Sequence, residues 1–452
     1  MKSFVVASLL AGLALAKPTP TEKQAPHKRS SLPTVTASGN AFWAGSDRFY
    51  VRGIDYQPGG SSDMSDPLAD EDVCKRDITE FKKLGINTIR VYITDNSADH
   101  DTCMNALADA GIYVILDANN PLYSINRDDP APSYNAVYLQ SVFATIDEFI
   151  QYDNTLAFFS GNEVVNDKVN TTLSAKYVKA TTRDMRQYIS KRGYRSVPVG
   201  YSAADVAQNR MQLAHYMNCG TDDVRSDFFA FNDYSWCNTD FTTSGWDVKV
   251  KNFTGYGIPL FISEYGCTTN GRDFGEVEAL MSDEMTFVYS GGLLYEYSKE
   301  DNDFGIVTID GTSVDESDDF TKYASALSAN PAPTGDGGFT STTNSVACPT
   351  ADSEWLIDTT ALPAIPAAAE KYMTEGAGTG PGLTGDGSQN AGSEDGDGAT
   401  STGDVTAASG SVSATATGES KAGITHVGPF DKTPLVLTGL VFCLSLFGTL
   451  LL

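Results

Sequence analysis

Between residues 49 and 298 the chain alternates between short apolar runs and longer amphipathic segments. The eight runs are rich in Val, Ile, Phe and Tyr, and their hydrophobicity is continuous, as in strands buried on both faces of a parallel sheet. They span Phe49–Gln57, Ile86–Ile93, Tyr113–Asn119, Leu156–Glu163, Val197–Ser202, Phe228–Trp236, Pro259–Gly266 and Gly292–Ser298. We expect each run to form a strand.

The segments between these runs have the apolar spacing of helices. Examples are Asp70–Leu84, Thr102–Ala110, Tyr138–Tyr152, Leu173–Arg192 and Phe274–Tyr289. Eight strands alternating with helices over about 250 residues match the size and order of a (β/α)8 TIM barrel. An open doubly wound sheet is the alternative, but the phosphate-binding first turn expected of it is not visible. We predict an α/β fold with a catalytic barrel at residues 41–330.

The first residues have the pattern of a signal peptide. Lys2 precedes an apolar run from Phe4 to Leu15, and Ala14-Leu15-Ala16 provides a small-residue cleavage site. We expect residues 1–16 to be removed and residues 17–40 to form an N-terminal leader. The basic pair Lys28-Arg29 leaves a second cleavage open.

The last residues predict a lipid anchor. An uncharged apolar run from Leu435 to Leu452 ends the chain, and small residues from Ser420 to Gly423 lie upstream of it. A retained transmembrane helix is the alternative, but no basic cluster follows the run. We expect a GPI signal at residues 424–452, attachment near Ser420 to Gly423, and a position at the outer leaflet of the plasma membrane or in the cell wall.

Composition divides the region between barrel and anchor. Residues 374–423 are rich in Gly, Ser, Thr, Ala and Asp and nearly free of aromatic residues, which predicts a flexible stalk. Residues 331–373 are expected to form an extension tethered to the barrel. The net charge of −27 argues against nucleic acid as a partner, because phosphate binding needs a basic surface.

Six of the seven cysteines precede the anchor signal, which indicates three disulfides in a secreted chain. Cysteine count alone leaves 15 pairings open. In the predicted barrel, Cys237 and Cys267 follow neighbouring strands, and Cys74 and Cys103 lie on neighbouring helices. The expected pairs are therefore Cys74–Cys103, Cys237–Cys267 and, by elimination, Cys219–Cys348.

Histidine is too scarce to support several kinds of chemistry. The four histidines include His27 and His426 in the tails, so neither a Ser-His-Asp system nor a histidine zinc site is supported. No nucleotide-binding glycine motif is present either. We expect no metal and no cofactor, and carboxylates remain as the candidate catalytic groups.

Glu163 and Glu264 end the fourth and seventh predicted strands, on the face where barrel enzymes hold their active sites. Cleaving a glycosidic bond requires one carboxylic acid to protonate the leaving oxygen, and a second carboxylate that attacks the anomeric carbon or activates water. In retaining enzymes these groups lie about 5–5.5 Å apart. Either glutamate alone could be a solvated strand-end residue, and Glu296 is a competing third acid. Their joint position favours a catalytic pair.

Other polar and aromatic side chains are expected at the same mouth. Asn162 is placed to bind a sugar hydroxyl and Tyr234 to orient Glu264, while Arg90 is expected to be a structural counter-ion. Candidates with less specific signals are Tyr92, Trp236 and Tyr297, whose rings could also be ordinary packing, and Asp117, which could be a plain strand-end carboxylate.

Several motifs resemble one known family. They are Arg90-Val91-Tyr92, Gly161-Asn162-Glu163-Val164, Asn232 through Cys237 and Ser263-Glu264-Tyr265-Gly266-Cys267. Together with Cys348 and both chain ends, they are similar to the fungal GPI-anchored β-1,3-glucanosyltransferases of glycoside hydrolase family 72. The similarity runs from about Phe42 to Tyr323.

The resemblance implies a retaining transglycosylase that remodels β-1,3-glucan of the fungal cell wall. It makes Glu163 the acid/base and Glu264 the nucleophile, and it places Tyr92, Asn162, Tyr234 and Tyr297, with Gln57 and Asp117, in the donor site. The same cysteine pairing follows from it. Many family members carry a cysteine-rich carbohydrate-binding module that we do not find here.

Three functional hypotheses follow: transfer between β-1,3-glucan chains, hydrolysis as an endo-β-1,3-glucanase, and non-catalytic glucan binding in the wall. The partners expected are glucan donor and acceptor chains and, through the GPI lipid, the plasma membrane. We expect a monomer. Asn170 and Asn252 begin glycosylation motifs in a secreted chain.

Overall fold

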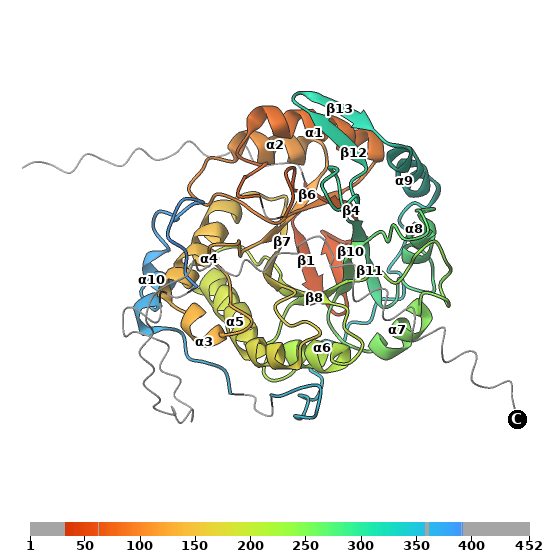
Figure 1. Ribbon diagram of the computed structural model, residues 1–452. Helices are drawn as coiled ribbons and strands as arrows, with labels where there is room; N and C mark the ends of the chain where they lie inside the picture. The colour runs from red at the N-terminus through yellow and green to blue at the C-terminus, as the bar shows by residue number, and fades with distance from the viewer. Residues whose placement is uncertain (1–31, 62, 358–360, 390, 392–452) are drawn as a thin grey trace, which may run out of the picture.

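The computed structural model describes residues 32–61, 63–357, 361–389 and 391. Its centre is a closed barrel of eight parallel strands ringed by helices (Figure 1). The strands are β4 (Val51–Asp55), β5 (Thr88–Val91), β6 (Tyr113–Asp117), β7 (Thr155–Asn162), β8 (Val199–Ala204), β9 (Phe228–Asn232), β10 (Leu260–Tyr265) and β11 (Tyr289–Leu294). Pairing of β11 with β4 closes the ring, which confirms the predicted TIM barrel.

Helices connect the strands and cover the outside of the barrel. They are α1 (Glu71–Leu84), α2 (Asp101–Asp109), α3 (Pro130–Ser133), α4 (Ala136–Phe149), α5 (Ala175–Lys191), α6 (Arg210–Asn218), α7 (Trp246–Phe253), α8 (Gly275–Leu280), α9 (Asp318–Ala329) and α10 (Tyr372–Glu375), with 3-10 turns η1 (Val169–Ser174) and η2 (Ala367–Ala369). Local chemistry sets their ends. In α1, the Asp70 side chain accepts from the N–H groups of Asp72 and Val73, and Gly85 ends the helix at φ 74°.

The eighth strand begins earlier than the sequence predicts. β11 starts at Tyr289 rather than Gly292, and α8 ends at Leu280, well before the predicted helix end. The pair Gly291-Gly292 interrupts the apolar run, so the pattern alone places the strand after it. In the barrel these glycines allow close packing: a Cβ on Gly291 would lie 2.0 Å from the carbonyl oxygen of Val51.

Two small antiparallel sheets extend the barrel. β1 (Val35–Ser38), β2 (Ala41–Ala44) and β3 (Asp47–Phe49) form the first, and β12 (Val307–Asp310) pairs with β13 (Ser313–Glu316) in the second. Phe42 and Phe49 of the first sheet pack against side chains inside the barrel, including Phe228 and Phe261. This sheet therefore closes the N-terminal end of the strands, and the opposite end stays available for the site.

Three disulfides join the pairs expected from the order of strands and helices: Cys74–Cys103, Cys219–Cys348 and Cys237–Cys267. Each crosslink restricts the unfolded chain and stabilises the fold by about 2–4 kcal/mol. After α9 the chain runs along the outside of the barrel, where Trp355 and Ile357 are buried.

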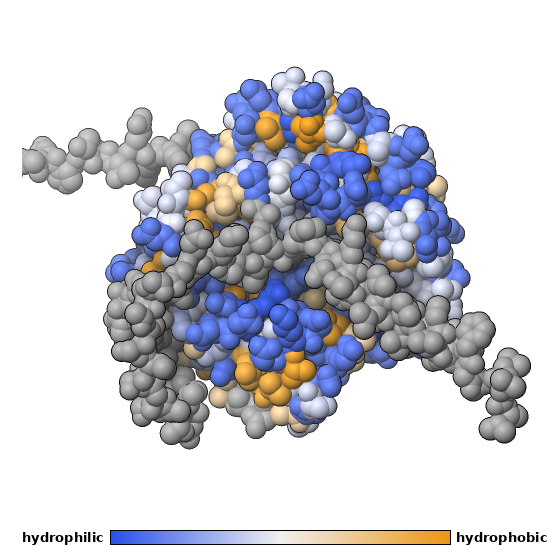
Figure 2. All heavy atoms as spheres, in the orientation of Figure 1, coloured by the Kyte–Doolittle hydropathy of each residue, from blue (hydrophilic) through white to orange (hydrophobic). Residues whose placement is uncertain are grey.

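Residues 374–389 of the predicted stalk lie on the barrel beside α4 and α5. The predicted signal peptide, residues 17–31 of the leader, most of the stalk and the GPI signal fall outside the described residues. Within the described ranges, no helix combines the length and apolar character needed to cross a membrane. The surface visible in Figure 2 is mostly hydrophilic, with small apolar patches.

Candidate active site

Glu163 and Glu264 meet through Asn232 at the C-terminal ends of the strands. Glu163 directly follows β7, Glu264 lies in β10, and Asn232 ends β9 between them. The Nδ2 group of Asn232 donates to Oε1 of Glu163 at 2.8 Å, and its Cα is paired with that of Glu264. The two carboxylates, 101 positions apart in the sequence, therefore flank one asparagine.

Glu264 lies at the floor of the mouth, with 1% of its surface exposed. Its Oε1 accepts from Arg90 Nη1 at 3.0 Å and from the Tyr92 hydroxyl at 2.8 Å, and its Oε2 accepts from the Tyr234 hydroxyl at 2.7 Å. Burial raises the pKa of Glu264 above its ordinary value; Arg90 opposes the shift and the Glu163 carboxylate adds to it. These donors hold the carboxylate in one orientation.

The two tyrosines stay protonated and act as donors. Burial raises the pKa of both Tyr92 and Tyr234 well above the ordinary value, and the negative charge of Glu264 raises them further. The Arg90 guanidinium also lies over the Tyr92 ring, 4.2 Å from its centroid, and lowers the pKa of that hydroxyl in part.

Arg90 is the cation at the centre of this acidic cluster. It is fully buried and binds Asp117 through Nη2 at 3.0 Å as well as Glu264. Asp55, at the end of β4, is also fully buried, and burial raises its pKa well above the ordinary value. The Arg90 guanidinium opposes this rise in the pKa of Asp55, as its expected role of counter-ion requires.

Glu163 has an unusual backbone conformation with φ 49°. A left-handed conformation costs a residue with a Cβ about 1–2 kcal/mol, so neighbouring contacts must hold it. The N–H of Glu163 donates to the Ser202 carbonyl at 2.9 Å, and Arg127 Nη2 donates to the Glu163 carbonyl at 2.6 Å. The conformation points the carboxylate toward Asn232 and away from the path of β7.

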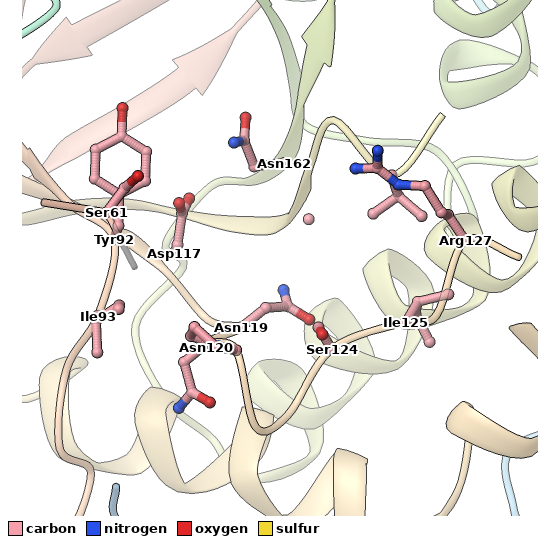
Figure 3. A pocket seen from close by; sticks show the side chains of 13 residues that line it. Ser61, Tyr92, Ile93, Asp117, Asn119, Asn120, Ser124, Ile125, Arg127 and Asn162 are labelled. Atoms are coloured by element: carbon pink, nitrogen blue, oxygen red, sulfur yellow. The ribbon is translucent and has the colours of Figure 1, made fainter. Parts of the chain in front are cut away.

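A cleft opens beside the pair (Figure 3). Asp117, Asn162 and Arg127 face it together with the loop that follows β6. Its lining residues are Ser61, Tyr92, Ile93, Asp117, Asn119, Asn120, Pro121, Ser124, Ile125, Arg127, Gly161, Asn162 and Val164. Hydroxyl, amide and carboxylate groups alternate with apolar side chains along it, which suits a ligand that has both hydroxyl groups and apolar faces.

Several predicted site residues lie at this mouth and others do not. Tyr92, Asp117 and Asn162 line the cleft, and Tyr234 holds Glu264. Gln57 is 1% exposed, and its amide binds the Ser65 carbonyl and the Ile93 N–H, so it supports the mouth from behind. Trp236 is 6% exposed and packs on Trp246 at 5.0 Å between ring centroids.

Tyr297 does not lie in the cleft, which corrects the placement expected from sequence. Its hydroxyl donates to Asp77 Oδ1 of α1 at 2.8 Å, and its ring packs against Phe81 on the outer side of the barrel. The chain leaves β11 after Leu294, so strand alternation no longer directs the side chains that follow.

Tyr295 is the aromatic residue of this segment at the mouth. Its ring centroid lies 6.4 Å from that of Tyr92, 6.2 Å from Tyr234 and 5.5 Å from Phe304. Tyr295 and Tyr297 belong to the same predicted strand, so the sequence pattern does not distinguish them and only the structure shows which ring lies at the mouth.

Asn232 is the second residue to which sequence analysis assigned no role. Besides binding Glu163, it donates to Asn162 Oδ1 at 3.0 Å, and its Oδ1 accepts from Ser202 at 3.0 Å and Ser263 at 2.8 Å. The Glu163 carboxylate and Asn162 Oδ1 settle the amide orientation, because both are acceptors and need the NH2 group of Asn232. Only the folded structure shows these contacts of Asn232, since the residues come from four different strands.

Glu296 is buried beside the mouth, and burial raises its pKa to about 8 while Asn302 donates to it. It hydrogen-bonds neither to Glu163 nor to Glu264 in the described contacts. Asn170 and Asn252, the two glycosylation motifs, are both exposed on the surface. Within the part of the chain that the structure describes, no three His, Cys, Asp or Glu side chains are grouped to hold a metal ion.

Comparisons with known proteins agree with this geometry. The glucanosyltransferase family profile, glycoside hydrolase family 72, matches residues 24–330. The chain is 60% identical over 385 residues to 1,3-beta-glucanosyltransferase gel1 of Aspergillus fumigatus, covering 85% of this chain and 84% of that protein. It is 51% identical to the GAS5 enzyme of Saccharomyces cerevisiae, over 82% of this chain and 76% of the relative.

Among solved structures, one similar fold is that of Saccharomyces cerevisiae Gas2p, a mutant in complex with laminaritetraose and laminaripentaose. The TM-score is 0.69 at 38% sequence identity, and the match covers 74% of this chain and 75% of that one. The barrel and its mouth thus have a counterpart in a protein bound to laminari-oligosaccharides.

Proposed function

Because this chain belongs to the glucanosyltransferases of glycoside hydrolase family 72, we propose that it cuts β-1,3-glucan and rejoins it to another chain. It cleaves an internal β-1,3 linkage and transfers the new reducing end to the non-reducing end of an acceptor, with retention of configuration. The observation that carries this proposal is the joining of Glu163 and Glu264 through Asn232 beside a polar cleft.

In the first step Glu264 attacks the anomeric carbon while Glu163 gives its proton to the departing glucosidic oxygen. A new ester bond forms between Glu264 and the sugar, the C–O bond breaks, and a glucan chain leaves with a free 3-hydroxyl. Oε1 of Glu264 accepts from two donors and Oε2 from one. We therefore assign Oε2 as the attacking oxygen and Oε1 as the oxygen that Arg90 and Tyr92 hold in place.

In the second step Glu163, now a carboxylate, takes the proton of an acceptor 3-hydroxyl. The acceptor oxygen attacks the anomeric carbon, the ester breaks, and Glu264 leaves as a carboxylate stabilised again by its three donors. Asn232 holds the carboxyl group of Glu163 in both steps. Asn162 and Asp117 face the cleft, where they can bind sugar hydroxyls.

Transfer exceeds hydrolysis when acceptor sugars hold the attacking hydroxyl in line, which gives it a large effective molarity over water. Product analysis tests this. Purified enzyme incubated with a laminari-oligosaccharide should yield products longer than the substrate. An endo-β-1,3-glucanase would yield only shorter ones, and a non-catalytic wall protein would yield none.

Two variants test the roles of the carboxylates. With a dinitrophenyl β-laminarioside, whose leaving group needs no protonation, Glu163→Gln should still release dinitrophenol in a first burst. Glu264→Gln should release none, because no nucleophile remains. A burst from Glu264→Gln equal to that of the unmodified enzyme would remove the nucleophile assignment.

The cellular setting is part of the proposal. We propose that the protein is secreted, carries a GPI lipid near Ser420 to Gly423 and acts as a monomer on wall glucan at the outer leaflet of the plasma membrane. Asn170 and Asn252 are exposed and therefore accessible to glycosylation. Release of the protein from cells by a phosphatidylinositol-specific phospholipase C would support the anchor, and retention after that treatment would speak against it.

A further inference from the structure

We infer that residues 376–389 form a strap that braces the cleft-lining loop 119–127 and so helps to shape the glucan-binding cleft. By composition these residues belong to the predicted stalk. The inference rests on the proposed function, because it assigns the strap a role in binding the same substrate. It depends on contacts at both ends and at the middle of the strap.

The strap starts on the helices behind the cleft. The N–H of Ala377 donates to Asp147 Oδ2 of α4 at 3.2 Å and to the Tyr188 hydroxyl of α5 at 3.0 Å. Gln140 of α4 donates to the Ala377 carbonyl at 3.2 Å. Ala377 is itself 2% exposed, so this end is a packed junction.

Its middle crosses the segment that follows β5. The N–H of Gly382 donates to Asn96 Oδ1 at 3.0 Å, and Nδ2 of Asn96 donates to the Ser141 carbonyl of α4 at 3.0 Å. Leu383 packs against the cluster that contains Tyr92, Ile93 and Tyr295. The strap thus touches the aromatic group at the mouth.

Its far end binds the cleft-lining loop directly. The N–H of Ser388 donates to the Leu122 carbonyl at 2.8 Å, and the Ser388 carbonyl accepts from Asn135 at 2.8 Å. Gln389 donates to the Ser124 hydroxyl at 2.8 Å and to the Ser124 carbonyl at 3.1 Å. Ser124 lines the cleft (Figure 3), so one residue separates the strap from bound sugar.

Glycines permit this close fit. A Cβ on Gly385 would lie 2.1 Å from the hydroxyl of Tyr123, whose side chain is buried. A Cβ on Gly380 would lie 2.4 Å from the backbone oxygen of Asn96. By contrast, a Cβ on Gly378 would meet no atom within 4 Å. A flexible spacer has no need of such contacts.

The braced loop reaches the catalytic acid. Asn119, Asn120 and Ser124 line the cleft, and at the end of the same loop Arg127 holds the carbonyl of Glu163. Loosening the strap therefore acts first on sugar binding along the loop, and only then on the position of Glu163. This order predicts a change in KM that exceeds the change in kcat.

The test uses the full-length protein with Gly380→Ala, Gly385→Ala or Gln389→Ala, and Gly311→Ala as a control outside the strap. Gly311 lies in the turn between β12 and β13, and a Cβ there would meet no atom within 4 Å. We expect the three strap variants to raise KM for laminari-oligosaccharides about three- to tenfold, with kcat changed less than twofold. The control should keep both values.

Hydrogen–deuterium exchange supplies a readout independent of activity. In Gly385→Ala and Gln389→Ala, amides of residues 119–127 should exchange several-fold faster than in the control. If both KM and loop exchange match the control in all three strap variants, the inference is wrong. If the unmodified enzyme forms no product longer than its substrate, the proposed transfer fails, while the exchange data still judge the strap.

Discussion

The side-chain amide of Asn232 lies 2.8 Å from the carboxylate of Glu163. Because Asn232 is paired in register with Glu264, this bond determines where the acid stands relative to the nucleophile. Two serine hydroxyls, from Ser202 and Ser263, fix the amide from the opposite side. The asparagine therefore serves as a rigid spacer between two carboxylates.

Replacing Asn232 by alanine should slow both chemical steps. A hydrogen bond to a charged group contributes about 1.5–3 kcal/mol, so kcat/KM should fall about tenfold to a hundredfold. Ser263→Ala removes only one of the two hydrogen bonds that serines donate to Asn232, so kcat/KM should fall only a few-fold. Initial transfer rates with a laminari-oligosaccharide give both values, and thermal unfolding reports whether each variant is folded. Equal rates for folded Asn232→Ala and unmodified enzyme would contradict the spacer role.

Removing the charge of Glu163 should lower the pKa of Glu264. Burial raises this pKa first, and the Glu163 carboxylate adds to the shift, so Glu163→Gln takes away one cause. Glu264 must be ionised to attack. The acid limb of the pH profile for the dinitrophenol burst should therefore move to lower pH. An acid limb that stays in place would show that the Glu163 charge does not raise this pKa, and one that moves upward would contradict the expected sign.

The two tyrosines of the last strand segment should differ in their effect on substrate binding. Tyr295→Leu removes a flat ring from the mouth and should raise KM about tenfold, and because the ring is buried it should also lower the unfolding free energy. Tyr297→Phe removes the hydrogen bond to buried Asp77 and should lower the unfolding free energy by about 1–3 kcal/mol. Its KM should stay unchanged. Urea denaturation and transfer kinetics on both variants make the comparison, and the reverse pattern would restore Tyr297 to the site.

Sequence periodicity was sufficient to predict those parts of the fold in which strands and helices alternate regularly. Strand order placed Glu163 and Glu264 at one rim, and the same order paired the cysteines. It misplaced Tyr297, because the chain leaves β11 after Leu294 and regular alternation ends there. Composition likewise assigned residues 376–389 to the stalk, because a glycine-rich segment with no known partner is expected to be flexible. Their contacts with Asn96, Tyr123 and Ser124 exist only once the barrel has formed.

His100 should make stability depend on pH in a defined window. It is fully buried between Asp66 and Glu148, with both ring nitrogens 2.8 Å from a carboxylate oxygen. Burial opposes the imidazolium charge, but the hydrogen bonds to Asp66 and Glu148 outweigh it and raise the pKa from 6.5 to about 9. The protonated ring thus ties the segment before α1 to α4.

The direction of this pH dependence follows from the difference between the folded and unfolded pKa of His100. A folded pKa above the unfolded one stabilises the protein fully below pH 6.5, and this contribution is lost as the pH rises through about 9. The shift corresponds to about 3 kcal/mol. Urea unfolding at pH 6 and above pH 9 should show this loss in the unmodified protein and in His215→Gln, whose half-buried ring has a lowered pKa. His100→Gln should be less stable at pH 6 and should lack the additional decline. An identical decline in His100→Gln would assign the effect to other groups.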